Sequence, residues 1–77
     1  MATKSQAFID AQKEVGENPA SSAAHAKLGA VLKDEGQYTE ALAAYDDALK
    51  HDGTNADAIK GQNAVYDVMD KQKGHKQ

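Results

Sequence analysis

The stretch from Leu28 to Leu49, LGAVLKDEGQYTEALAAYDDAL, constrains the fold most, because it holds two helix-like apolar periods separated by a glycine. The second period follows the i, i+3, i+4, i+7 spacing of an amphipathic helix and comprises Tyr38, Ala41, Leu42, Tyr45, Ala48 and Leu49. Gly36, between the two periods, is the residue type best able to take the left-handed conformation that ends a helix. The stretch therefore predicts two helices packed as a hairpin.

The composition extends this prediction to the whole chain of 77 residues. Alanine recurs throughout and aromatic residues are scarce, which suits closely approaching helices better than a sheet sandwich. The chain has no cysteine, so neither a disulfide nor a thiolate metal site can support the fold, and the core must come from apolar packing. We expect an all-α fold of four antiparallel helices in a single domain spanning residues 1–77.

Turn and capping residues set the expected helix boundaries. The predicted helices cover residues 4–15, 22–35, 38–50 and 55–73, and residues 74–77 form a tail. The expected caps are Thr3 with Gln6 for the first helix, Ser21 or Ser22 for the second, and Thr54 with Asp57 for the fourth. Gly16 should end the first helix and Gly36 the second, while Asn18-Pro19 forces a turn between them. Gly61 costs about 1 kcal/mol inside the fourth helix, and its small size would let a neighbouring helix come close.

The outer helices differ in how well they hide their apolar residues. In the first, Phe8, Ala11 and Val15 share one face and are expected to pack inward. The fourth is mixed, with polar residues at Gln62, Asn63, Asp67 and Asp70 and apolar ones at Tyr66, Val68 and Met69. Two outcomes are therefore open: this helix is a solvating cap, or it buries its apolar residues against a second copy of the chain.

Charge and hydropathy exclude several classes of partner. The formal net charge is -3, and acidic and basic residues are mixed along the chain, which argues against nucleic acid as a ligand. No apolar run approaches the roughly 20 residues that span a bilayer. The N-terminus, MATKSQAF, lacks the apolar segment of a secretory signal. We expect a soluble, cytoplasmic protein without a membrane partner.

The order helix, glycine, tyrosine-led helix and Asp-Gly turn resembles the tetratricopeptide repeat (TPR), and the interval of 34 residues from Pro19 to Gly53 equals its period. The matching residues are Leu28, Gly29, Leu32, Gly36, Tyr38, Glu40, Ala41, Tyr45, Ala48 and Leu49. His25 stands in place of the usual tryptophan-like residue, and Gly53 in place of a proline. The resemblance covers about residues 22–55 and implies one full repeat between two half repeats. Gly29 and Ala41 are expected to face each other where the helices approach most closely, and the tyrosines are expected in the core.

The resemblance also implies a site, because the first helix of each repeat in this family lines a groove that holds an extended peptide or a partner helix. The equivalent residues are Ala23, Ala26, Lys27, Ala30, Lys33, Lys60, Asn63 and Ala64. Family members that bind acidic C-terminal tails use a carboxylate clamp of lysine, arginine and asparagine. Here Ala30 and Ala64 stand where asparagine is expected, so only the three lysines offer charge to an acidic ligand. An exposed lysine is ordinarily a solvated residue, which is the competing interpretation of each one.

The resulting prediction is a small adaptor that binds another protein, as a peptide or a helix and with an acidic ligand as one option. Two alternatives remain. The chain can be a structural module that self-associates through exposed helix faces, for example as a homodimer, or it can be a piece of a longer TPR scaffold. Met1 argues mildly against the last.

Catalytic and metal-binding motifs are missing from the sequence, so we expect no enzyme activity, no cofactor and no metal. The histidines are not spaced as ligands on one helix. His25 is expected to pack at the start of the second helix, and His51 to interact with the dipole at the end of the third. Residues 52–55 differ from a calcium loop in the position of the glycine and in lacking a closing glutamate. The acid pairs at 34–35 and 46–47 lie at predicted helix ends or on solvent faces.

Overall fold

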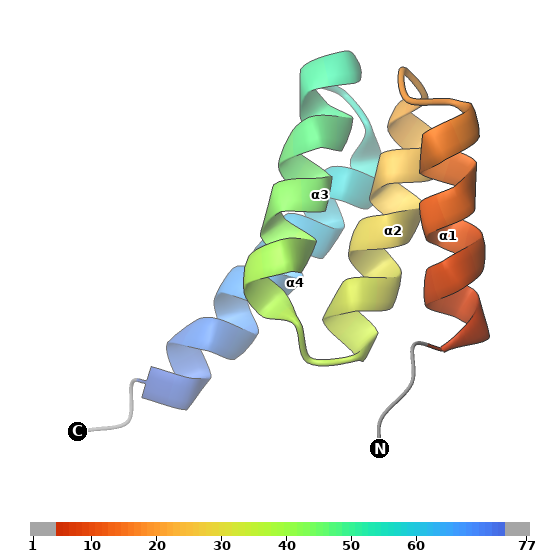
Figure 1. Cartoon of the computed structure of the whole chain (residues 1–77). Helices are drawn as coiled ribbons and strands as arrows, with labels where there is room; N and C mark the ends of the chain where they lie inside the picture. Colours follow the sequence, from red (N-terminus) through yellow and green to blue (C-terminus); the bar gives the residue numbers. More distant parts are fainter. Residues whose placement is uncertain (1–4, 74–77) are drawn as a thin grey trace.

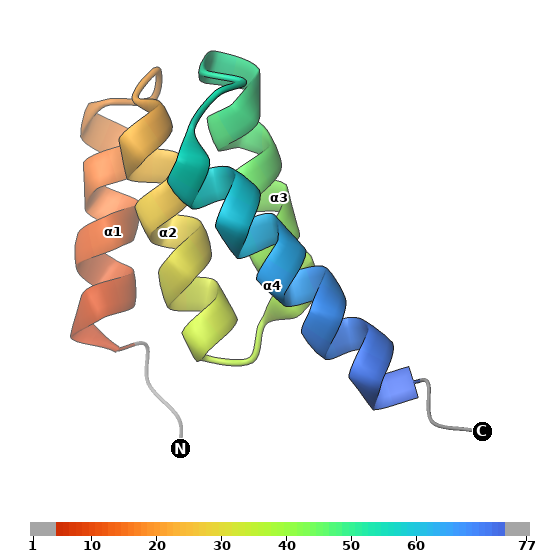
Figure 2. The same cartoon turned by 180° about the vertical axis from the view of Figure 1, so that it is seen from behind.

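The computed structural model describes residues 5–73, and this part of the chain forms four helices. They are α1 (Gln6–Glu17), α2 (Ser22–Asp34), α3 (Tyr38–His51) and α4 (Ala56–Lys73). Successive helices alternate in direction, and α4 crosses α3 obliquely so that its C-terminal half projects beyond the other helices (Figures 1 and 2). Within residues 5–73, α2 packs against all three other helices, whereas α1 packs against α2 alone. The predicted all-α fold of four helices is confirmed.

The start of α1 differs from the prediction. The helix begins at Gln6, and its cap is Ser5, whose side chain accepts a hydrogen bond from the backbone N–H of Phe8 at 3.1 Å. The Ser5 hydroxyl also donates to the carboxylate of Glu35, just beyond α2. Thr3, the predicted cap, lies outside the described residues. Because Ser5 satisfies an orphan donor of the first turn, the capping role belongs to it.

The ends of α1 and α2 follow different rules. Gly16 does not end α1, which continues to Glu17, and the N–H of Asn18 donates to the carbonyl of Glu14 at 2.9 Å. The prediction that α1 ends at Gly16 was therefore wrong. The hydrogen bond from Asn18 closes the last turn, so the helix needs no glycine in the left-handed conformation at its end. Gly36 behaves as predicted, with a φ of 81° directly after α2. Its backbone therefore takes a conformation that other residues adopt only at a cost.

The second helix is capped by one of the two predicted serines. Ser21 accepts a hydrogen bond from the backbone N–H of Ala24 at 3.1 Å. Ser22, the first residue of α2, instead donates its hydroxyl to the carbonyl of Ala48 in α3 at 2.7 Å. The two adjacent hydroxyls therefore have separate roles, one capping α2 and the other joining α2 to α3.

Asn55, and not the predicted Thr54, caps α4. Its side-chain oxygen accepts from the N–H of Ala58 at 3.1 Å, and its amide donates to the Ser22 hydroxyl at 2.7 Å. The hydroxyl and N–H of Thr54 donate to Asp52 Oδ1 at 2.7 and 3.0 Å, which holds the pKa of that carboxyl below its ordinary value. Thr54 thus closes the turn before α4, while Asn55 joins the start of α4 to α2.

The core runs along the facing sides of all four helices. Its buried members are Phe8, Ala26, Leu32, Ala41, Ala44, Tyr45, Ala48, Ala58 and Val65. Phe8 and Ala11 of α1 are buried and Val15 is half-buried, so the predicted inner face of α1 is confirmed. Alanine dominates this list, and the backbones can therefore approach closely around the few large side chains.

Two glycines make room for the ring of Tyr45. A Cβ atom placed on Gly29 of α2 would lie 2.8 Å from two ring carbons of Tyr45, and one placed on Gly61 of α4 would lie 2.1 Å from its Cζ. Gly29 therefore faces the Tyr45 ring. The prediction that Gly61 permits a close approach is confirmed. A single side chain of α3 thus packs against both α2 and α4.

The outward side of α4 leaves apolar residues in solvent. Tyr66 is 54% exposed and Ile59 is 41% exposed, whereas Val68 and Met69 are half-buried. Tyr45 lies in the core as expected and Tyr38 is half-buried, but the prediction for Tyr66 was wrong. Within residues 5–73 no further helix packs on that side of α4. None of the helices in this range combines the length and the apolar character needed to cross a bilayer.

Candidate functional site

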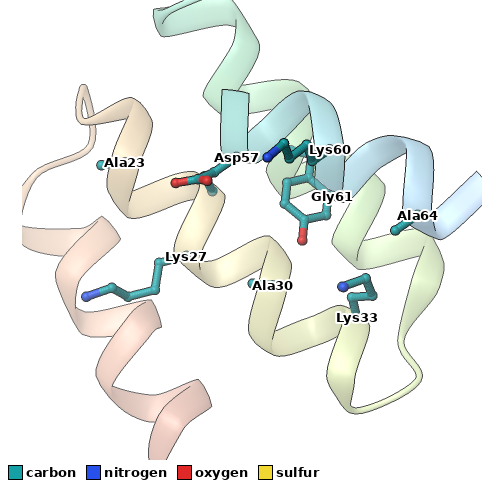
Figure 3. Close-up of a pocket in the computed structure, with 10 residues that line it drawn as sticks. Ala23, Lys27, Ala30, Lys33, Asp57, Lys60, Gly61 and Ala64 are labelled. Carbon is teal, nitrogen blue, oxygen red and sulfur yellow. The ribbon is translucent and has the colours of Figure 1, made fainter. Parts of the chain in front are cut away.

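A hollow with a volume of about 620 Å³ lies between α2 and α4, and we call it the α2–α4 hollow (Figure 3). Its lining residues are Ala23, Ala26, Lys27, Ala30, Lys33, Tyr45, Asp57, Lys60, Gly61 and Ala64. Helix α2 supplies one wall and α4 the other, and Tyr45 reaches between them from α3. Because Ala23, Lys27 and Lys60 are exposed, the hollow is accessible from solvent.

Seven of the eight residues predicted to form a groove line the α2–α4 hollow. The exception is Asn63, which is exposed and lies outside the lining. The residues that α4 contributes are 57, 60, 61 and 64, which follow the i, i+3, i+4, i+7 spacing of one helix face. Asn63 lies off that face.

Three lining residues were missed by sequence analysis, namely Tyr45, Asp57 and Gly61. The same helical spacing that joins Lys60 to Ala64 would have identified Asp57 and Gly61. No comparable signal marked Tyr45, because the apolar pattern of α3 assigns it to the core and the hollow is formed by two other helices.

Small side chains shape the hollow. Ala26 and Gly61 are buried, and Ala30 and Ala64 are half-buried. These residues extend little from their helices, so the space between α2 and α4 stays open above the Tyr45 ring. Such an opening admits the side chain of a ligand, which a wall of larger apolar residues would exclude.

The three lysines of the hollow are not equivalent. Lys27 Nζ lies 2.9 Å from Glu14 Oε1, and Figure 3 shows its side chain directed toward α1. In the described part of the chain, Lys33 and Lys60 have no ion pair. Asp57 is the acidic residue among the lining side chains. The charge available to a ligand is therefore two unpaired ammonium groups and one carboxylate.

The histidines form a separate contact outside the hollow. His25 is buried at the start of α2, as predicted, and its Nε2 lies 2.7 Å from the carbonyl oxygen of Pro19. Its ring stacks on that of His51, with centroids 5.3 Å apart and an angle of 17° between the planes. Sequence analysis missed this pair, which joins the start of α2 to the last residue of α3. Among residues 5–73, no group of three or more His, Cys, Asp and Glu side chains converges in a way that could hold a metal ion.

Comparison with known proteins identifies no relative of the chain. No protein-family model, curated protein or solved structure matches the chain. The geometry and charge of the α2–α4 hollow are therefore the basis for a functional proposal.

Proposed function

We propose that this chain is a non-enzymatic protein-binding module of the TPR type, in which the α2–α4 hollow binds a peptide segment or a partner helix of another protein. The observation that carries the proposal is the hollow itself, with its small-residue lining and its two unpaired lysines. Support for the TPR assignment comes from the α2–α3 hairpin, from Gly36 at its turn and from the close contact between Gly29 and Tyr45.

The size of the hollow suits such a ligand. Sites for small ligands typically measure roughly 300–1,000 Å³, and about 620 Å³ falls within this range. A volume of this order holds a few side chains of a peptide. It does not hold a folded domain, so a protein partner would offer one segment.

The charges of the hollow favour an acidic ligand. Lys33 and Lys60 carry ammonium groups without an ion pair, whereas Lys27 already interacts with Glu14. A carboxylate placed between α2 and α4 could pair with either ammonium group without breaking an existing ion pair. Asp57 opposes this preference with one negative charge among the lining residues.

Replacing Lys33 and Lys60 together with alanine should weaken binding of an acidic peptide by about tenfold, since each partly exposed ion pair contributes up to about 1 kcal/mol. The probe is a capped nine-residue peptide with glutamate at its centre and alternating alanine and serine elsewhere. Titration into ¹⁵N-labelled protein gives the dissociation constant, and the amide signals of α2 and α4 should move.

Lys50→Ala is the matched control, because Lys50 is an exposed lysine of α3 that lies outside the hollow. Its affinity for the peptide should equal that of the parent protein. Lys27→Ala should have a smaller effect than the double variant, since its ammonium is shared with Glu14. Signals that move only in α1 and α3, or no binding at millimolar peptide, would reject the proposed site.

A second candidate function is self-association through the outward side of α4, which the exposed Ile59 and Tyr66 favour. These two residues lie seven positions apart, on one face of the helix. Stable interfaces bury at least about 1,200 Å² in total, which is more than two partly exposed side chains on each copy provide. We therefore expect the monomer mass in sedimentation equilibrium from micromolar to millimolar concentration. A dimer that Ile59→Ser and Tyr66→Ser disrupt would instead favour self-association.

A further inference from the structure

The ring of Tyr45 is held in one position by backbone on two sides. It lies against Gly29 of α2 and Gly61 of α4, at distances that leave no space for a methyl group on either glycine. Only 2% of the residue is exposed. The side chain therefore cannot swing away from the hollow, and the direction of its hydroxyl is fixed by the packing of three helices.

The hydroxyl at the end of this ring has no hydrogen-bond partner within residues 5–73. In this part of the chain, every polar side-chain atom that is buried away from solvent has a hydrogen-bond partner. Because Tyr45 Oη has no such partner, it must be in contact with solvent. Since Tyr45 lines the α2–α4 hollow, its hydroxyl opens into that space. The oxygen lies on the α4 side, because a Cβ on Gly61 would be 2.4 Å from it.

The surroundings disfavour ionisation of this hydroxyl. Burial raises the pKa of the Tyr45 phenol above its ordinary value, and the nearby carboxylates of Asp34 and Asp57 raise that pKa further. A neutral phenol is both a donor and an acceptor, and near neutral pH its proton is available to a ligand. Lys33 and Lys60 line the same hollow, and their positive charges would offset the repulsion that Asp34 and Asp57 exert on a bound carboxylate.

We propose that the Tyr45 hydroxyl determines the specificity of the α2–α4 hollow by donating a hydrogen bond to the side-chain carboxylate of a bound acidic peptide, whose charge Lys33 and Lys60 balance. This inference rests on the proposed function and adds the atom that makes the contact. An acidic side chain enters between the two helix walls and ends at the fixed phenol. An apolar side chain of similar size instead covers the hydroxyl without pairing it.

The physical reason for selectivity is the cost of an unpaired buried polar group. A hydrogen bond to a charged acceptor is among the stronger kinds, whereas a donor covered by an apolar group loses its contact with water and gains nothing. A site built around a hydrogen-bonding group therefore discriminates strongly against a ligand that lacks the matching atom. This discrimination is larger than the one an apolar pocket achieves between ligands that differ by one methylene group.

The test combines Tyr45→Phe with two peptides. One is the nine-residue peptide with a central glutamate, and the other carries leucine at that position. Tyr45→Phe should weaken binding of the glutamate peptide by about tenfold and leave the leucine peptide unchanged or slightly tighter. The ratio of the two affinities should therefore fall by about tenfold, which is a double-mutant cycle between protein and ligand.

A direct readout comes from protein labelled with ¹³C at tyrosine Cζ, which gives one signal for each of three tyrosines. The Tyr45 signal is assigned as the one that Tyr45→Phe removes, and the glutamate peptide should shift it. Tyr66→Phe is the control, because Tyr66 is 54% exposed and does not line the hollow. Its affinity for both peptides should equal that of the parent protein.

The possible outcomes distinguish a failure of the role of the Tyr45 hydroxyl from a failure of peptide binding in the α2–α4 hollow. If neither peptide moves the signals of α2 and α4, the proposed function fails. If the glutamate peptide binds at the hollow but the Tyr45 Cζ signal stays in place, or Tyr45→Phe keeps the full preference for glutamate, the role of the hydroxyl is overturned while the function stands. Thermal melting checks that Tyr45→Phe is folded. If it is not, the Tyr45 signal of the unsubstituted protein is assigned by elimination with Tyr38→Phe and Tyr66→Phe, and its response to the glutamate peptide decides the question.

Discussion

Replacing Gly61 by alanine should destabilise the protein by about 2–3 kcal/mol, although the same change in an open helix position stabilises by about 1 kcal/mol. The added Cβ would lie 2.1 Å from Tyr45 Cζ and 2.4 Å from two further atoms of that side chain. The ring has little room to retreat, because Gly29 of α2 also lies against it. Either α4 must move away from α3 or the ring must leave its place, and both outcomes disrupt the core.

Chemical denaturation followed by circular dichroism measures this effect, and Gly16→Ala is its control. Gly16 also lies in a helix, and a Cβ there would meet nothing within 4 Å. Gly16→Ala should therefore leave stability unchanged or raise it slightly, so the two substitutions should act in opposite directions. Equal effects would contradict the packing described for Tyr45. In the Tyr45→Leu background, Gly61→Ala should cost less than it does in the parent protein, because the shorter side chain removes the clash.

Tyr45→Ala should be the most damaging substitution in the chain, with an expected loss of about 3–5 kcal/mol. Domains of this length are stable by roughly 4–12 kcal/mol in total, so the loss would remove between about a quarter and all of that stability. The reason is that the Tyr45 ring packs against both α2 and α4, and its removal leaves two glycine surfaces facing a cavity.

Tyr66→Ala provides the comparison, since it removes a side chain of the same size from a site that is 54% exposed. It should cost less than about 1 kcal/mol. Urea unfolding curves of both variants give the difference directly. A loss at Tyr45 no larger than the loss at Tyr66 would show that the core does not depend on this ring.

Much of the fold followed from local sequence signals. The apolar spacing in α3 and the glycine at position 36 were sufficient to predict the α2–α3 hairpin, because both act within a single helix or turn. The periodicity also identified the inner face of α1 at Phe8 and Ala11. Helix caps were predicted less well: Ser5 and Asn55 take the roles assigned to neighbouring threonines. Adjacent Ser, Thr and Asn residues have similar capping preferences, and for Asn55 the hydrogen bond to Ser22 of α2 adds a partner that is distant in sequence.

The candidate site was predictable as a face but not in its chemistry. The resemblance to the tetratricopeptide repeat implied a groove face with Ala23, Ala26, Lys27, Ala30 and Lys33, and the structure brings these residues to one hollow. The pairing of Lys27 with Glu14 involves two helices, so no local pattern indicates it. The same holds for the Tyr45 hydroxyl, which comes from a third helix and emerges between the other two. Sequence spacing cannot predict contacts of this kind, because they form only when the helices pack against one another.

The position of α1 has a consequence for how the molecule opens. Among the described helices it rests on α2 alone, mainly through Phe8 and Ala11, whereas α2, α3 and α4 contact one another around Tyr45. Its detachment would leave the Tyr45 contacts and both walls of the hollow in place. Local unfolding of α1 therefore requires less free energy than global unfolding, and the chain divides into a cooperative three-helix unit and one terminal helix that can separate from it.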